Sequence, residues 1–265
     1  MITRNQVTSL AKQLKTNELT VFREYLQILF LSKLSQHAES KGILFKGGTA
    51  VHLMFKAPRF SEDLDFTVTL SDAGFNRVIG EVFDELQREE QVEFKERKTL
   101  TGRRFLLHGL KGAMKFATFI NLDFSFREKA LEPTHSLIDT PYPVLITAYI
   151  NHLSAEEICA EKIRAILTRR KGRDIYDLWY LLSKGTTIRA ELVTQKLKYY
   201  ELGAYDVAKL IDRIETFGEK DFVMDLRPFI SIGEREKLPE MFRYTQQYLK
   251  QKLAQVNNLD KYVKK

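Results

Sequence analysis

The stretch that decides the fold is KGGTAVHLMF at residues 46–55, which is followed after three residues by RFSEDLDF at residues 59–66. The apolar residues 43–45 before it are typical of a short buried strand, and residues 49–55 are typical of a helix. Gly47 and Gly48 predict a tight turn between the two, at which a ligand can approach the backbone closely. Free amides at such a turn, with the positive end of a helix dipole, indicate a site for an anion such as a triphosphate.

The second part of this stretch carries carboxylates in a strand-like pattern. Side chains alternate between the faces of a strand, which places four polar residues together: Arg59, Ser61, Asp63 and Asp65. The two aspartates would lie roughly 6–7 Å apart along the strand. Carboxylate oxygens on a rigid strand are ligands that Mg²⁺ accepts beside substrate phosphates. The sequence therefore predicts a phosphate site and a metal site about one hairpin apart.

Either feature alone would be weak, because a lone Gly-Gly is usually only a turn and a lone Asp-x-Asp is usually a solvated strand edge. In this order and spacing they are specific. The stretch resembles the nucleotidyltransferase-like toxins of the AbiEii/AbiGii type, whose relatives include the MenT enzymes. Their pattern is a Gly-Gly-Thr/Ser turn and helix, then Arg-x-Ser-x-Asp-x-Asp-Phe, and this chain matches it at Gly47, Gly48, Thr49, Arg59, Ser61, Asp63, Asp65 and Phe66.

The composition is that of a globular protein with an excess of positive charge. Of the 265 residues, 44% are hydrophobic and 29% are charged, and the net charge of +7 favours a polyanionic partner such as nucleic acid. Cys159 is the only cysteine, which excludes an intramolecular disulfide and fits a reducing setting. No apolar run is long enough to cross a bilayer, so we expect a cytoplasmic protein without a membrane partner.

The order of the predicted elements indicates two lobes. Helices are expected within residues 1–40 and from 72 to about 90. Three strand-like segments follow, the last two joined by a turn at Lys111-Gly112: residues 92–99, 103–109 and 114–126. Prolines then mark a connection, after which the pattern is almost wholly helical. The predicted fold class is α/β (α+β), with a lobe of residues 1–145 around a small mixed sheet and a helical lobe of residues 146–265.

The last of these strands contains a third candidate carboxylate. Asn121, Asp123 and Ser125 share one face of it. In the wider polymerase-β-like nucleotidyltransferases, a third carboxylate facing the first two completes the metal site, and Asp123 resembles that position. The alternative is an ordinary exposed aspartate, since the match rests on one residue.

A second candidate centre lies in the helix predicted over residues 154–167. At about 100° per residue, Lys162 falls near the middle of a broad apolar arc, whereas Glu157, Glu161 and Arg164 face away from it. A lysine on a buried face is costly unless an anion meets it. Lys162 is therefore a candidate for binding a ligand's negative charge, although most helix-surface lysines are simply solvated.

The next predicted helix begins with Asp174, which also faces inward, and has Asp177 at the rim of its apolar arc. We expect Lys162 and Asp174 to meet in a cleft opposite Asp63 and Asp65, and we expect Lys162→Ala to cost catalysis rather than stability. Capping of the helix is the alternative explanation for Asp174. The second signature of the resembled family is Glu-Lys followed by an Arg-Asp-x-x-Asp-Leu helix, and it is matched at Glu161, Lys162, Arg173, Asp174, Asp177 and Leu178.

The resemblance covers roughly residues 43–182 and implies a polymerase-β-like nucleotidyltransferase lobe with a helical lobe. It implies a toxin of an abortive-infection or toxin–antitoxin pair, with a cognate antitoxin as partner, which transfers nucleotides from an NTP to an acceptor. For the MenT relatives that acceptor is the 3′ end of tRNA, so translation would be blocked. Each candidate residue then receives a role. Mg²⁺ would be held by Asp63 and Asp65 with help from Asp123, and the phosphates by Gly47, Gly48 and Thr49. Lys162 would neutralise charge on the triphosphate, Asp177 would bind the nucleotide, and Asp174 would bind the nucleotide or the acceptor, or orient Lys162.

Three questions stay open at this stage. Ser61 is either a structural hydroxyl beside the nucleotide or a site of self-modification. The same chemistry can act on a small molecule, for which a closed acidic pocket would be typical, whereas a basic groove would favour RNA. A non-catalytic NTP-binding or interaction module is the remaining alternative, and the presence of Asp63, Asp65 and Lys162 argues against it.

Overall fold

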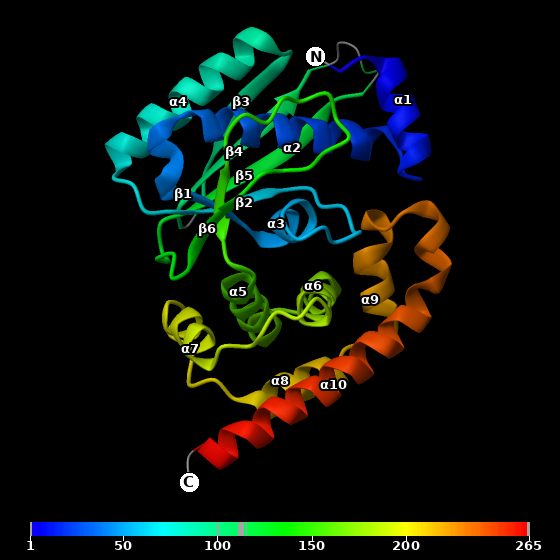
Figure 1. Cartoon of the computed structure of the whole chain (residues 1–265). Coiled ribbons are helices and arrows are strands. Elements are labelled where there is room, and N and C mark those ends of the chain that lie inside the picture. Colours follow the sequence, from blue (N-terminus) through cyan, green and yellow to red (C-terminus); the bar gives the residue numbers. More distant parts are fainter. Residues whose placement is uncertain (1, 100, 111–113, 115, 264–265) are drawn as a thin grey trace. The chain divides into compact units, whose positions relative to one another are not determined.

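The structure is a computed structural model that describes residues 2–99, 101–110, 114 and 116–263, with side chains described as far as residue 255. It divides into two compact units, Met1–Ser154 and Ala155–Lys265 (Figure 1). The sequence places the boundary near residue 145, and the division comes later in the chain because strand β7 (Ile150–Leu153) pairs within the sheet of the first unit. Within the described residues, no helix has both the length and the apolar character needed to cross a membrane.

The first unit is built on a mixed sheet. In the described residues its strands are β1 (Ile43–Lys46), β2 (Leu64–Val68), β3 (Val92–Arg97), β4 (Arg103–Gly109), β5 (Thr118–Ser125), β6 (Pro133–Ser136) and β7. The strands follow the order β3-β4-β5-β2-β1-β7-β6. The pairs β2/β5 and β1/β7 are parallel and the other neighbours are antiparallel, so the mixed sheet predicted from the sequence is confirmed.

Two of these strands were not predicted, because β6 and β7 are four residues long and carry polar side chains without clear alternation. The predicted strand over residues 114–126 is shorter than expected, with β5 beginning at Thr118. The predicted Lys111-Gly112 turn lies outside the described residues.

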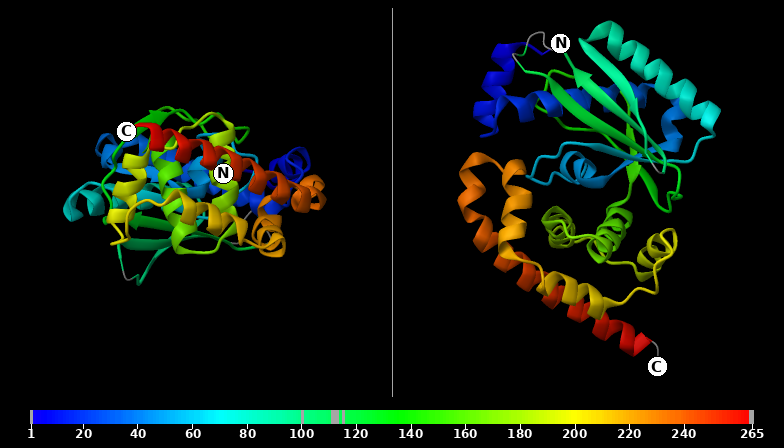
Figure 2. Two further views of the ribbon diagram at one scale, coloured as in Figure 1. Left: turned by 90° about the horizontal axis from the view of Figure 1, so that it is seen from below. Right: turned by 180° about the vertical axis from the view of Figure 1, so that it is seen from behind.

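Helices α2 and α4 pack on one face of this sheet and enclose the core. The helices of the unit are α1 (Arg4–Gln13), α2 (Glu18–Gln36), α3 (Gly47–Leu53) and α4 (Asp72–Glu89), with a 3₁₀ turn η1 (Ala38–Gly42). Figures 1 and 2 show α2 and α4 on the same side of strands β3 to β5. Aromatic pairs between helix and strand fix this layer, with ring centroids 6.0, 4.9 and 3.8 Å apart in Phe30–Phe66, Phe75–Phe124 and Phe83–Phe94.

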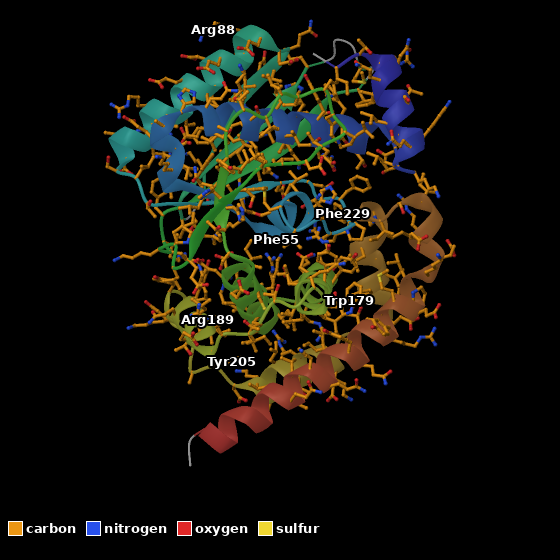
Figure 3. All side chains as sticks on the ribbon, in the orientation of Figure 1. Phe55, Arg88, Trp179, Arg189, Tyr205 and Phe229 are labelled. Carbon is orange, nitrogen blue, oxygen red and sulfur yellow. The ribbon has the colours of Figure 1, made fainter. Side chains whose placement is uncertain are left out.

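The second unit is helical, as predicted. Its elements are α5 (Ala155–Thr168), α6 (Gly172–Ser183), α7 (Ala190–Lys198), α8 (Val207–Glu215), α9 (Glu219–Leu226), η2 (Arg227–Phe229), η3 (Ile232–Lys237) and α10 (Leu238–Val263). α5 packs against α6, α7 and α8, and its apolar residues Ile158, Cys159 and Ile163 are fully buried. Trp179 of α6 lies among aromatic rings of the same unit, 5.3 Å from Tyr176 and 6.1 Å from Tyr244 (Figure 3).

Candidate active site

The glycine turn and the Asp65 carboxylate are packed against each other. β1 ends at Lys46 and α3 begins at Gly47, whose φ of 75° lies in the left-handed region. A Cβ on Gly47 would lie 2.2 Å from Asp65 Oδ2, and a Cβ on Gly48 would lie 2.3 Å from a guanidinium nitrogen of Arg59. The turn therefore requires glycine, and its backbone lies directly beside one of the predicted metal ligands.

Residues 59–63 do not form the predicted strand, because β2 begins only at Leu64. Arg59 is buried under Gly48 instead of sharing an open polar face, and its Nη1 donates to the Phe60 carbonyl at 3.0 Å. Ser61 Oγ also lies beside this turn, 3.4 Å from where a Cβ of Gly48 would be. The prediction that Arg59 and Ser61 follow the alternation of Asp63 and Asp65 is therefore wrong, since no sheet ladder fixes this segment.

Thr49 links the turn to the carboxylate segment. Its side chain is buried and its hydroxyl donates to the backbone carbonyl of Asp63. The Thr49 hydroxyl is therefore occupied by a hydrogen bond within the protein, and a phosphate bound at this turn would contact the backbone amides. α3 is seven residues long, so amides rather than a long helix dipole would hold the anion.

Three predicted carboxylates gather on β2 and β5. Asp65 and Asp123 are partners in the parallel register of these strands. Asp63 Oδ1 accepts a hydrogen bond of 2.9 Å from Asn121 Nδ2, which brings the residue before β2 against β5 as well. All three aspartates are partly exposed, so a ligand can reach them.

Arg104 is a further member of this group that the sequence analysis missed. Its Nε donates to Asp123 Oδ1 at 2.5 Å, and the two residues are partners across β4 and β5. The hydrogen bond to Asp123 raises the pKa of Arg104, and the charges of Asp63 and Asp65 add to that increase. Arg104 thus interacts electrostatically with all three carboxylates. Nothing local in the sequence marks Arg104, because its position depends on the register of two strands.

The carboxylates fit a metal that is shared with a substrate. Within the described residues, no three histidine, cysteine, aspartate or glutamate side chains are grouped closely enough to hold a metal ion by themselves. Asp65 and Asp123 are neighbours on adjacent strands, whose backbones lie about 4.8 Å apart. Mg²⁺ usually takes one or two carboxylates and completes its ligands with phosphates and water. Asp65 and Asp123 therefore supply the number of carboxylates that Mg²⁺ usually takes when phosphates complete its ligands.

A buried ion pair behind the turn was also missed. His52 Nε2 lies 2.8 Å from Glu24 Oε2, and its Nδ1 lies 2.5 Å from the Ala57 carbonyl oxygen. Burial by itself lowers the pKa of His52, but the Glu24 carboxylate outweighs it and the pKa is raised. A protonated ring can donate at both nitrogens, which ties α3 and the loop after it to α2. Glu24 is distant in the sequence, so no local pattern signals this pair.

In the second unit, the expected contact between Lys162 and Asp174 is confirmed. Lys162 Nζ lies 3.1 Å from Asp174 Oδ1 and 2.7 Å from Asp177 Oδ2. The ammonium therefore has two carboxylate partners within its own unit rather than one. These carboxylates supply the anion that a lysine on a buried face requires.

Asp174 also holds an arginine that sequence reasoning did not single out. Arg169 donates to it through two atoms, Nε to Oδ2 at 2.7 Å and Nη2 to Oδ1 at 3.0 Å. Burial alone would raise the pKa of Asp174, but the positive charges of Lys162 and Arg169 hold it well below its usual range. The Arg169 side chain remains 60% exposed, so a buried carboxylate fixes an accessible guanidinium.

The expectation that Glu157 and Glu161 face away from the core is wrong. Both are buried, and Lys196 Nζ of α7 lies 2.7 Å from Glu157 Oε1 and 3.0 Å from Glu161 Oε1. Arg164, expected to face solvent, is half-buried with its guanidinium carbon 4.1 Å from the centre of the Tyr200 ring. Periodicity along α5 could not reveal that α7 covers this side of the helix.

Solved structures with the same fold include nucleotidyltransferase toxins. MenT4, a nucleotidyltransferase toxin from Mycobacterium tuberculosis H37Rv, matches with a TM-score of 0.59 at 19% identity, over 94% of this chain and 94% of its own. JHP933 from Helicobacter pylori matches with a TM-score of 0.55 at 19% identity, over 94% of this chain and 99% of its own. At this identity the likeness concerns the fold, and it confirms the predicted fold class. A search of curated protein sequences finds no significant match.

The family assignment rests on the sequence itself. The profile described as nucleotidyl transferase AbiEii toxin, type IV toxin–antitoxin system, matches residues 29–262, which include both the glycine turn with its carboxylates and the Lys162 segment. This match confirms the resemblance inferred from the two motifs, and it implies an NTP substrate and an antitoxin partner. The chain is thus a nucleotidyltransferase that belongs to the AbiEii toxin family of type IV toxin–antitoxin systems.

Proposed function

We propose that this nucleotidyltransferase transfers a nucleoside monophosphate from an NTP to the 3′ end of an RNA, with tRNA as the acceptor, and thereby blocks translation in the cytoplasm. The observation that carries the proposal is the position of Asp65, which lies between the Gly47 turn and Asp123. A phosphate-binding backbone beside paired carboxylates is the arrangement that phosphoryl transfer requires. The net charge of +7 supports a polyanionic acceptor.

In the first unit, the backbone amides of residues 47–49 and the Ser61 hydroxyl would contact the triphosphate. Asp63 and Asp65 would hold Mg²⁺ together with Asp123. When bound, Mg²⁺ neutralises charge on the phosphates and orients them. Release of Asp123 from Arg104 would free that guanidinium for a phosphate oxygen.

In the reaction, the 3′-hydroxyl oxygen of the acceptor would attack the α-phosphorus of the NTP. A bond from this oxygen to phosphorus forms, the bond from the α-phosphorus to the bridging oxygen breaks, and pyrophosphate leaves. Asp123 would accept the proton of the attacking hydroxyl. The carboxylates and the amides of the turn would hold the reacting groups in line.

In the second unit, Lys162, Asp174 and Asp177 would act on the nucleotide as one group. The two carboxylates fix the ammonium of Lys162, and Asp174 also fixes the exposed guanidinium of Arg169. The exposed guanidinium of Arg169 would then be the cation of this group that contacts the triphosphate, and Lys162 would hold Asp174 and Asp177 in place. The cognate antitoxin would be the partner that limits this activity.

The test is transfer of a labelled nucleotide. The purified chain is incubated with each of the four α-labelled NTPs, Mg²⁺ and total RNA, and the products are separated on a denaturing gel. We expect labelled tRNA with at least one NTP, abolished by EDTA and by Asp65→Asn. Label that enters only small molecules, or no transfer with any NTP and the whole RNA pool, would contradict the proposal.

A further inference from the structure

One face of strands β3, β4 and β5 continues outward from the carboxylates. The register places Arg104 beside Asp123, Leu106 beside Asn121, and His108 beside Phe119, all on the same face. The opposite face is buried beneath α2 and α4 (Figure 1). We call the open face of these strands the acceptor face, defined by Lys95, Arg97, Arg104, Leu106, His108 and Phe119.

The acceptor face carries an exposed stacked ring pair. The rings of His108 and Phe119 have centroids 4.6 Å apart with planes 16° from parallel. Phe119 is 49% exposed, which is unusual for a phenylalanine in a central strand. A flat aromatic surface of this kind can accept an unpaired nucleobase by stacking.

β3 adds two positive charges to the acceptor face, Lys95 in the row of Asn121 and Arg97 in the row of Asp123. Lys95 and Arg97 of β3 are exposed and are the register partners of Leu106 and Arg104. One acidic side chain shares this part of the face, with Glu93 Oε2 3.9 Å from His108 Nδ1. Arg104 is paired with Asp123, and the two cations of β3 outweigh the Glu93 carboxylate, so this part of the face suits a phosphate backbone.

The spacing also suits a strand that ends at the carboxylates. Phe119 and Asp123 are four residues apart on β5, which is roughly 13 Å along a strand. A few unpaired nucleotides cover that distance. Because the face is formed by a rigid sheet, a base held at Phe119 would fix the position of the 3′ end.

We infer that the acceptor face binds the single-stranded 3′ segment of the RNA acceptor, with a base stacked on Phe119 and phosphates on Lys95 and Arg97. The inference rests on the proposed transfer to RNA. It adds that unpaired nucleotides before the 3′ end are required, so an RNA with a fully paired, blunt 3′ end is a poor acceptor.

The experiment compares Phe119→Ala with Tyr149→Ala, an exposed aromatic in the same unit that also contacts a histidine ring, that of His135. Fluorescence anisotropy measures binding of a short single-stranded RNA without NTP. Phe119→Ala should weaken binding and raise the acceptor KM at least fivefold, with the NTP KM unchanged. Phe119→Trp should restore binding, which a purely structural role would not predict.

The charge contribution is tested with Lys95→Ala/Arg97→Ala against Lys41→Ala, an exposed lysine on η1. The slope of log affinity against log salt should fall by about 1.4 for the double variant, since each lost phosphate contact to a single strand removes about 0.7. The control should leave the slope unchanged or nearly so.

The outcomes separate the two proposals. Transfer to RNA with equal RNA binding by Phe119→Ala and Tyr149→Ala would overturn the acceptor face and leave the proposed function standing. Absence of transfer to RNA would contradict the proposed function, while the binding measurement would still show whether the acceptor face binds single-stranded RNA. A wild-type dimer that Phe119→Ala dissociates, with RNA binding unchanged, would identify a second copy as the occupant and overturn the inference.

Discussion

The carboxylate group of the first unit and the charged group of the second differ in how far the protein itself satisfies their charges. Asp63, Asp65 and Asp123 are partly exposed, and the arginine that pairs with Asp123 is 45% exposed. By contrast, the side chains of Lys162, Asp174 and Asp177 are 9%, 2% and 0% exposed and bond to one another.

This difference separates two ways of building a charged site. Partly exposed carboxylates beside a glycine turn keep room for ligands that a substrate brings. A buried lysine between two carboxylates is already neutralised. Its geometry is fixed because separating the ion pair would leave an unpaired charge in the interior, which costs free energy. The carboxylates of the first unit are therefore arranged to bind a ligand, whereas the charged side chains of the second unit are arranged to stay paired with one another.

The largest expected effect is on catalysis in the first unit. Asp65→Asn should lower transfer at least a thousandfold, which is about 4 kcal/mol of transition-state stabilisation, because the amide cannot replace a charged metal ligand. The unfolding midpoint should change little, since Asp65 is partly exposed. Transfer rates and thermal unfolding measure the two effects.

The control for this prediction is Glu62→Gln, which alters a carboxylate of the same segment that pairs with Arg23. It should retain most of the transfer activity. Wild-type transfer by Asp65→Asn would show that the carboxylate group is not the reaction centre.

The second effect is on stability in the second unit, and here the structure corrects the sequence analysis. Lys162→Ala was expected to spare stability, but it would remove a partner from two buried carboxylates. We expect a loss of about 3 kcal/mol in the free energy of unfolding. The fluorescence of Trp179, the only tryptophan of the chain and a residue of α6, reports the unfolding of this unit.

A double variant checks the mechanism of that loss. Lys162→Ala/Asp177→Asn removes one carboxylate together with its cation and should be more stable than Lys162→Ala alone. If the single variant is as stable as the wild type, the ammonium does not hold this group together, and the contrast between the two units is lost.

Gly47→Ala should have an intermediate effect on stability and a large one on transfer. The new Cβ would lie 2.2 Å from Asp65 Oδ2 and would also strain a residue at φ 75°. Gly185→Ala is the matched control, because Gly185 has φ 94° and its Cβ would meet no heavy atom within 4 Å. We expect a loss of about 2 kcal/mol for Gly47→Ala and about 1 kcal/mol for the control. Equal losses with transfer intact would show that the turn and the carboxylate are independent.

The features that the sequence predicted are those fixed by neighbours along the chain. The strand, glycine turn and helix around Gly47 follow from local propensity, and the carboxylate at Asp65 follows from alternation in a true strand. The contact between Lys162 and Asp174 could be predicted because both residues fall on the apolar sides of consecutive helices. Local rules succeed where the position of a side chain is fixed by its neighbours along the chain.

The features that it missed depend on segments that meet only in the folded chain. Arg104 reaches Asp123 through strand register, and His52 reaches Glu24 through the packing of α3 on α2. Glu157 is buried because α7 brings Lys196 to it. A helical wheel contains no information about which other element covers a face, so a charged side chain with a distant partner appears solvated.

The smallest expected effect concerns the pH dependence of stability and tests how firmly Asp174 is held. Its pKa is lower in the folded chain than in the unfolded chain, so it contributes stability that is complete above its unfolded pKa of about 3.9 and is lost as the pH falls below that value. Chemical unfolding followed by Trp179 fluorescence should show the free energy of unfolding decreasing between pH 5 and pH 3. Asp174→Asn should reduce this slope by at most about 1.4 kcal/mol per pH unit.

Asp139→Asn, which alters a carboxylate that is 84% exposed, is the control and should leave the slope unchanged. An equal slope in Asp174→Asn and the wild type would mean that Lys162 and Arg169 do not hold Asp174 in its charged form, and the contrast between this charged group and the carboxylates of the first unit would then be lost.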